Sequence, residues 1–282
     1  MNLMERLISQ RKISPLLRGL GCFPVGCGAP PIMVAGYNGE TDDVRRLLKL
    51  GADVNTFERG FTPLITTLQS ARLDTARLLI ASGADVNAIT PDGESVLALA
   101  AHGGYLEIAS LLIERGADVN FATGKGETPL LFAAIMGRTE VVDLLIRHGA
   151  QLDVCNWLGR TPLMEAAFYG QQSVIEILVR AGANPDLADN HGGTALIFAT
   201  VRGHREAVRH LLEINANPHV ADHSGYNALM IASVKGFAGI VSLLLEHGAD
   251  PHHFGHDGAS ALSLAGDAGY AGIAALLNGA IL

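Results

Sequence analysis

The sequence predicts an all-α repeat solenoid, in which short helix-turn-helix units stack on one another. Within its 282 residues a Gly-Ala mark, often followed by Asp or Asn, recurs every 32 or 33 residues. A second series of glycines keeps a period of 33, and periods of this length are typical of stacked repeats. Composition agrees, because 49% of the residues are hydrophobic but only 5% are aromatic, which favours cores of small side chains. The second series is Gly60, Gly93, Gly126, Gly159, Gly192, Gly225 and Gly258.

Each unit begins with a helix whose start is marked by a capping residue. Two residues after each glycine of the second series stands Thr, Ser or Asn, whose side-chain oxygen can accept from the first-turn N–H groups. Proline follows in several units at the first helical position, where a missing N–H does no harm. The helix usually ends at another glycine, which suits a left-handed backbone. The capping residues are Thr62, Ser95, Thr128, Thr161, Thr194, Asn227 and Ser260.

The second helix of each unit carries apolar residues at positions i, i+3 and i+4, as Val141, Leu144 and Leu145 do. A glycine such as Gly149 stops this helix, and a loop leads to the next unit. One unit alone cannot bury the apolar faces of its helices, so neighbouring units stabilise one another by stacking. Ala-Ala pairs in the first helices suit close helix packing, and we expect a larger residue at Ala133 to overpack it.

The segment GETPLLFAAIMGRTEVVDLLIRHGA, residues 126–150, resembles an ankyrin repeat. Similar segments in register cover about residues 28–280. The resemblance implies stacked helix pairs with β-hairpin finger loops at right angles to them. We expect an N-terminal capping segment at residues 1–27 and an ankyrin repeat array at residues 28–282. The expected repeats are 28–55, 57–89, 90–122, 123–155, 156–188, 189–221, 222–254 and 255–282.

The chain departs from the family pattern at two kinds of position. The histidine of the family's Thr-Pro-Leu-His motif is replaced throughout, for example by Ile65 and Met164. We therefore expect apolar packing in place of the hydrogen bonds that the family's histidine supports. Repeat two has Ala71 where other units have a glycine between the helices, so we expect a distorted turn there.

The two ends of the array need cover, because a terminal repeat has no neighbour on one side. Residues 1–27 contain apolar residues that could cover the first repeat. At the other end Ile273, Leu276 and Leu277 have no following unit. We expect this end either to fold over its neighbour or to contact another chain, including self-association with a second copy.

Charge and composition exclude several classes of partner. The net charge of −8 argues against nucleic acid, whose phosphates need clustered Lys and Arg. No apolar run reaches the ~20 residues that span a bilayer, so we expect no membrane insertion. The cysteines Cys22, Cys27 and Cys155 cannot form a disulfide framework, although a bridge between Cys22 and Cys27 stays open. We therefore expect a cytoplasmic protein.

Residues that the scaffold does not need are the candidates for function. The resemblance implies that finger tips and the exposed edge of the first helices line one concave side. Repeat five fills these positions with large apolar and aromatic residues beside arginine, a combination typical of protein interfaces, although local packing would also explain them. We predict a non-catalytic scaffold that binds a partner protein there, centred on repeats four to six. The predicted contact residues are Trp157, Leu158, Arg160, Phe168, Tyr169, Lys125, Glu127, Ile135, Met136, Val201, Arg202 and Tyr226.

Two alternatives stay open at the level of sequence. A secreted bacterial effector would bind a host protein through the same groove. A metal- or thiol-dependent activity would use the histidine-rich C-terminal fingers, where His219 and His252 are one period apart, as are His223 and His256. However, the chain has no phosphate-binding loop and no HExxH or GxSxG motif, and nothing basic is arranged to activate Cys155. We therefore predict that the protein is not an enzyme and needs no cofactor.

Overall fold

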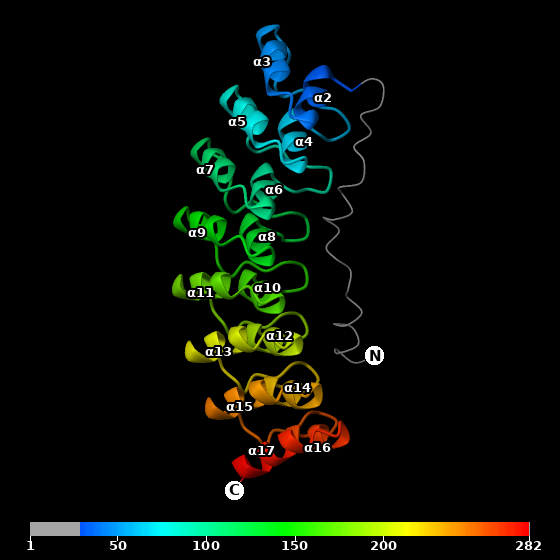
Figure 1. Cartoon of the computed structure of the whole chain (residues 1–282), viewed down its shortest axis with the longest axis vertical. Helices are drawn as coiled ribbons and strands as arrows, with labels where there is room; N and C mark the ends of the chain where they lie inside the picture. The colour runs from blue at the N-terminus through cyan, green and yellow to red at the C-terminus, as the bar shows by residue number, and fades with distance from the viewer. Residues whose placement is uncertain (1–28, 282) are drawn as a thin grey trace. The chain divides into compact units, whose positions relative to one another are not determined.

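The structure is a computed structural model that describes residues 29–281 (Figure 1). The predicted capping segment, residues 1–27, lies outside the described residues, as do Cys22 and Cys27. The chain divides into two compact units. Within the described residues, the first comprises 29–133 and 147–150, and the second comprises 134–146 and 151–281.

In the first unit the helices stack in two rows. The first helices of successive repeats, α2, α4 and α6, contact one another in order, and so do the second helices α3, α5 and α7. Each first helix also packs against the second helix of its own repeat. The bounds are α2 (Pro31–Asn38), α3 (Thr41–Lys49), α4 (Pro63–Gln69), α5 (Leu73–Ala81), α6 (Val96–Gly103), α7 (Leu106–Glu114) and α8 (Pro129–Ile135), whose last two residues belong to the second unit.

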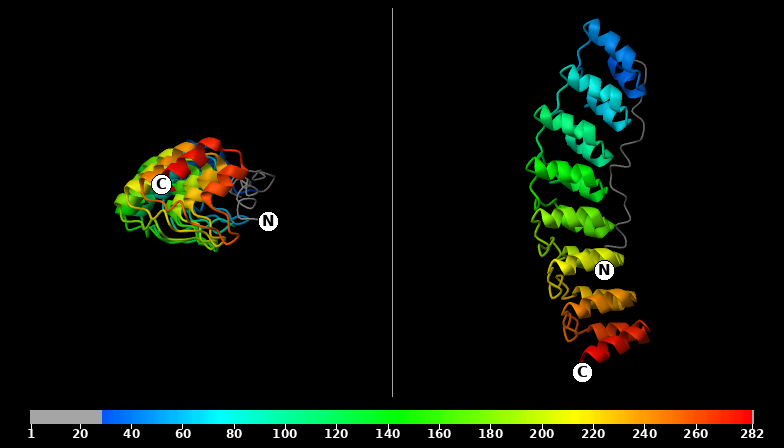
Figure 2. Two further views of the ribbon diagram at one scale, coloured as in Figure 1. Left: turned by 90° about the horizontal axis from the view of Figure 1, so that it is seen from below. Right: turned by 60° about the vertical axis from the view of Figure 1, so that its left-hand side comes forward.

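The second unit repeats the same arrangement. Helices α10, α12, α14 and α16 form the row of first helices, and α11, α13, α15 and α17 form the row of second helices. In each unit the loops that precede the first helices gather on one side of the helices (Figure 2). The bounds are α9 (Thr139–Arg147), α10 (Pro162–Tyr169), α11 (Gln172–Arg180), α12 (Ala195–Arg202), α13 (Arg205–Glu213), α14 (Ala228–Lys235), α15 (Ala238–Glu246), α16 (Ala261–Asp267) and α17 (Ala271–Ile281).

The predicted capping residues begin the first helices as expected. Thr161, for example, has extended backbone and its hydroxyl oxygen accepts from the N–H of Met164 at 3.3 Å. The same bond forms at every other predicted cap. At the other end of α10, Gly170 has φ +69°, and its N–H and the next one bond back to the helix. The capping residue at the start and the left-handed residue at the end therefore set the bounds of the first helices.

The turn at Ala71 is not distorted, which contradicts the expectation from sequence. Ala71 takes φ +56°, close to the glycines that stand at this position in other repeats, such as Gly137 at +65°. The N–H groups of Ala71 and Arg72 bond to Leu68 and Thr67, the pattern that Gly104 and Tyr105 show in the next repeat. Stacking therefore holds an L-residue in a left-handed conformation that ordinarily costs about 1–2 kcal/mol.

The cores are formed by small and medium apolar side chains. Ala133 and Ala134 are fully buried, as the close packing of first helices requires. The positions that replace the family's histidine are also buried where they are apolar, for example Ile65 at 0% and Met164 at 1% exposure. Apolar packing thus occupies these positions, as expected.

The fingers are turns rather than long hairpins, and the described residues contain only isolated β-bridges. In four fingers the side chain of the first residue accepts from the backbone N–H groups two and four residues further on, which folds the loop. These residues are Thr123, Asn156, Asp189 and Asp222. In the second unit the fingers also bond to one another: Asn190 N–H donates to Leu158 O at 3.0 Å, and His223 N–H donates to His191 O at 2.9 Å. The bridges join Glu58 to Phe61, Ile89 to Ser95, Ala221 to Asn227 and Phe254 to Ser260.

The last helix folds over its neighbours. Helix α17 packs on α15 and α16 and buries Ile273 and Leu277, whereas Leu276 stays 42% exposed. No helix within residues 29–281 is long and apolar enough to cross a membrane.

Candidate functional site

Repeat five exposes two large aromatic side chains. Trp157 on its finger is 64% exposed, and Tyr169 at the end of α10 is 44% exposed. The finger is held by Asn156, whose side-chain oxygen accepts from the N–H groups of Leu158 and Arg160 at 3.0 and 3.1 Å. The carbonyl of Trp157 accepts from Asn190 of the next finger at 2.9 Å. The backbone around Trp157 is therefore fixed while its ring faces solvent.

Phe168 lies between the exposed Tyr169 and the buried Phe198. Its ring is half-buried and meets Tyr169 edge-on at 5.1 Å and Phe198 at 6.0 Å between centroids. The guanidinium of Arg202, which is exposed, lies 4.9 Å from the Phe168 centroid. This arrangement is a cation–π contact at the surface of repeats five and six.

Arg160 differs from its expected role, because the structure buries it. The residue is 8% exposed, and its guanidinium lies 4.5 Å from the Phe198 centroid and 5.5 Å from that of Phe168. Its Nη1 is 3.7 Å from Glu165 Oε1, and its Nε is 3.6 Å from Asp189 Oδ2. A guanidinium in this position supports the surface from beneath and is not open to a partner.

The other predicted contacts in the second unit vary in exposure. Met136 is 37% exposed, Ile135 and Leu158 are half-buried, and Val201 is buried at 9%. Tyr226 is half-buried, and its hydroxyl donates to Asp257 Oδ2 at 2.7 Å, which raises the pKa of Tyr226 to about 12. Burial, reinforced by Glu165, also raises the pKa of Tyr169, although Arg160 and Arg202 oppose the shift. Both hydroxyls are therefore protonated at neutral pH.

Lys125 and Glu127 belong to the first unit, where they lie among acidic finger residues. Lys125 is exposed and Glu127 is half-buried. The pKa of the nearby Glu94 is raised to about 7, mainly by burial and also by the carboxylates of Asp92 and Glu127, while Lys125 partly offsets these effects. This group is a local concentration of negative charge on the fingers of the first unit.

The C-terminal histidines and Cys155 are the other residues that the sequence offered for metal or thiol chemistry. No group of three or more His, Cys, Asp or Glu side chains within residues 29–281 could hold a metal ion. His253 Nε2 lies 2.8 Å from the carbonyl oxygen of Gly225. Cys155 is an exposed free thiol.

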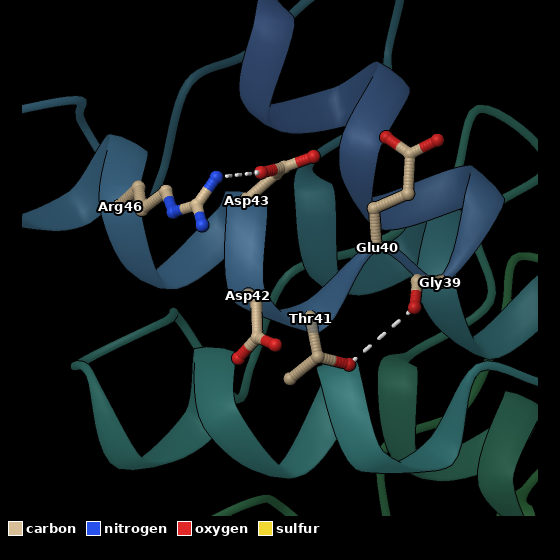
Figure 3. Close-up of a pocket in the computed structure, with 6 residues that line it drawn as sticks. All are labelled: Gly39, Glu40, Thr41, Asp42, Asp43 and Arg46. Carbon is tan, nitrogen blue, oxygen red and sulfur yellow. Dashed lines mark hydrogen bonds and ion pairs between the residues drawn. The ribbon is translucent and has the colours of Figure 1, made fainter.

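An open depression lies at the start of α3 in the first unit (Figure 3). Most of its charged groups form ion pairs. Arg46 pairs with Asp43 at 3.2 Å. Asp42 pairs with Arg45, which lies just outside the depression. Thr41 donates to the carbonyl of Gly39 at 3.5 Å. The lining residues are Gly39, Glu40, Thr41, Asp42, Asp43 and Arg46.

Sequence reasoning missed three residues that support the repeat-five aromatics: Glu165, Asp189 and Phe198. A signal was present, because Glu165 is the one acidic residue in a column of otherwise neutral, mostly apolar residues spaced by one repeat. Buried charges need partners, so an acid in that column predicts a nearby cation. The column is Thr66, Leu99, Phe132, Glu165, Phe198, Ile231 and Leu264.

The fold and its periodic caps define a tandem helical-repeat protein. The family model described as "Ankyrin repeats (3 copies)" matches residues 2–90, 32–123, 97–189, 148–222 and 178–254. The chain therefore belongs to the ankyrin repeat family.

Two comparisons with individual proteins agree with this assignment. The structure is similar to the crystal structure of the human ASB11 ankyrin repeat domain, with a TM-score of 0.68 and 27% identity over 89% of this chain and 97% of that chain. The DNA-binding protein RFXANK of Homo sapiens is 38% identical over 68 residues, which is 23% of this chain and 26% of that protein. The match thus spans about a quarter of that relative's length. Ankyrin repeats are generally scaffolds for protein–protein interaction.

Proposed function

We propose that this protein is a non-catalytic scaffold whose partner protein binds at the repeat-five surface, defined as Trp157, Leu158, Phe168 and Tyr169 with Met136 and Arg202 at its edge. The proposal rests on the exposure of Trp157 and Tyr169, together with the hydrogen bonds that hold the finger of repeat five in place. Tryptophan, tyrosine and arginine are the residues most enriched among those that dominate binding energy.

Hydrogen bonds and packing around repeat five support this assignment, because they hold the backbone near the exposed rings in one conformation. The finger of repeat five is bonded internally through Asn156 and to the next finger through Asn190. Phe168 contacts Tyr169 edge-on, and the buried Arg160 lies against the Phe168 ring. A surface that is ordered before binding loses less conformational entropy when a partner arrives.

The test is affinity capture from a cell extract with the wild-type chain beside a Trp157→Ala/Tyr169→Ala variant. Both side chains are mostly outside the core, so the variant should fold normally, which circular dichroism checks. We expect partners captured by the wild-type chain to be lost or weakened at least tenfold in the variant, since a hot-spot truncation costs about 2 kcal/mol or more.

A matched control uses Phe254→Ala. Phe254 is also an exposed aromatic residue on a finger, at 62%, but it lies at the end of repeat seven. The control variant should keep the partners. A folded Trp157→Ala/Tyr169→Ala variant that retains every partner would remove the repeat-five surface as the binding site.

A further inference from the structure

Four residues of the second unit occupy one register position along successive repeats. Each directly precedes the glycine that ends its first helix, namely Gly137, Gly170, Gly203 and Gly236. Helices α10, α12 and α14 contact one another in order, so their ends form a column. Along it the side chains change from apolar and aromatic to basic. The column is Met136, Tyr169, Arg202 and Lys235.

The two basic residues of the column, Arg202 and Lys235, form no ion pair among the residues that the structure describes. Other surface arginines of this unit are paired, for example Arg180 with Glu176. Asp189, which belongs to the same repeat as Arg202, faces Arg160 instead and accepts two finger N–H groups.

The apolar end adjoins the basic end directly. Arg202 lies 4.9 Å from the Phe168 ring, and Phe168 lies 5.1 Å from Tyr169. Packed helices are about 8–10 Å apart, and an extended chain advances about 3.3 Å per residue. One repeat therefore corresponds to about three residues of an extended ligand.

We propose, building on the function proposed above, that the partner presents an extended acidic segment to this column. An apolar side chain of the segment packs against Tyr169 and Met136. Glu or Asp carboxylates about three and about six residues further along meet Arg202 and Lys235. Two single cations spaced by one repeat suit separate carboxylates better than a nucleic-acid backbone, which favours dense clusters of Lys and Arg.

The experiment is selection of displayed random twelve-residue peptides on the immobilised full-length chain. Peptides are scored only if Tyr169→Ala abolishes their binding, which restricts the analysis to this column. We expect selected peptides to carry an aromatic or aliphatic residue with Asp or Glu enriched at the third and sixth positions from it. Sequence logos from the wild-type chain give the readout.

The matched comparison uses Arg202→Gln/Lys235→Gln beside Arg180→Gln. The double variant should lose the acidic preference and bind the selected peptides about 4- to 25-fold more weakly, because each exposed ion pair changes affinity by about 2- to 5-fold. Arg180→Gln, which removes an arginine on α11, should leave both unchanged.

Three outcomes would contradict the proposal that the ligand is an acidic segment: enrichment of basic residues, no charge preference, or no selected peptide whose binding depends on Tyr169. The first two would leave the proposed binding surface standing. Failure of that surface is judged separately, by capture with the Trp157→Ala/Tyr169→Ala variant.

Discussion

Removal of Arg160 is the sharpest test of how repeat five is held together. Arg160→Met keeps an unbranched side chain but removes the charge that faces Glu165 and Asp189. Both carboxylates are nearly sealed from solvent, with side chains 7% and 3% exposed. Without Arg160 both carboxylates lose the guanidinium that faces them.

The size of the effect follows from the burial and the distances. Breaking a buried ion pair costs about 3–5 kcal/mol because an uncompensated charge remains. Here the closest distances of 3.6 and 3.7 Å are longer than direct hydrogen bonds, so we expect a loss of about 2–4 kcal/mol. The matched control, Arg180→Met, breaks an exposed pair with Glu176 and should cost about 0.5 kcal/mol or less.

The assay is urea unfolding followed by circular dichroism and by the fluorescence of Trp157, the single tryptophan of the chain. Because repeat arrays gain stability from each unit and each interface, the tryptophan reports on repeat five in particular. Arg160→Met/Glu165→Leu should be less destabilised than Arg160→Met, since it removes one of the two buried carboxylates that face Arg160 from a mostly apolar column. Equal losses for Arg160→Met and Arg180→Met would refute the reasoning.

The remaining predictions concern the scaffold and one titrating group. Ala71→Gly should stabilise the chain by about 0.5–1 kcal/mol, because relief of the strain at φ +56° exceeds the added flexibility of the unfolded chain. Gly269→Ala should destabilise it, because Gly269 has φ +78°, although no atom lies within 4 Å of an added Cβ. Urea unfolding midpoints measure both changes. Ala133→Leu should lower the free energy of unfolding by about 1–3 kcal/mol, because it overpacks a fully buried site. The control Ala81→Leu, at an exposed position, should change the melting temperature little. An unchanged melting temperature for Ala133→Leu would contradict the packing. The folded pKa of Glu94, about 7, lies above its ordinary 4.5, so the folded state binds more protons and stability falls as pH rises from about 4.5 to about 7. Glu94→Gln should therefore match wild type at pH 4 and exceed it by about 1–2 kcal/mol at pH 8, after allowance for solvent screening, and parallel pH profiles would count against the shift.

Most of the fold could be predicted from sequence because it depends on local, repeated rules. A capping hydroxyl or amide two residues after a glycine, and a left-handed glycine at the other end, specify each first helix without knowledge of its neighbours. Ala71 shows where this reasoning stops. A missing glycine suggests distortion, but the packed repeats on both sides impose the regular turn on alanine.

The candidate site could be predicted only in part, for a physical reason. The exposure of Trp157 follows from its place on a short finger, which register alone supplies. The burial of Arg160 depends on Asp189, which is 29 residues away in sequence on the next finger, and on Phe198 in the next helix. Contacts between repeats decide which finger residues stay open, and a position within one repeat does not reveal them.

The central claim is that a partner protein lies against the repeat-five surface. The most direct measurement is photo-crosslinking of a captured partner after Trp157→p-benzoylphenylalanine substitution, with Phe254→p-benzoylphenylalanine as the control. The account predicts a crosslink to the partner from position 157 and none from position 254. A partner that stays bound but crosslinks only from position 254 would contradict it.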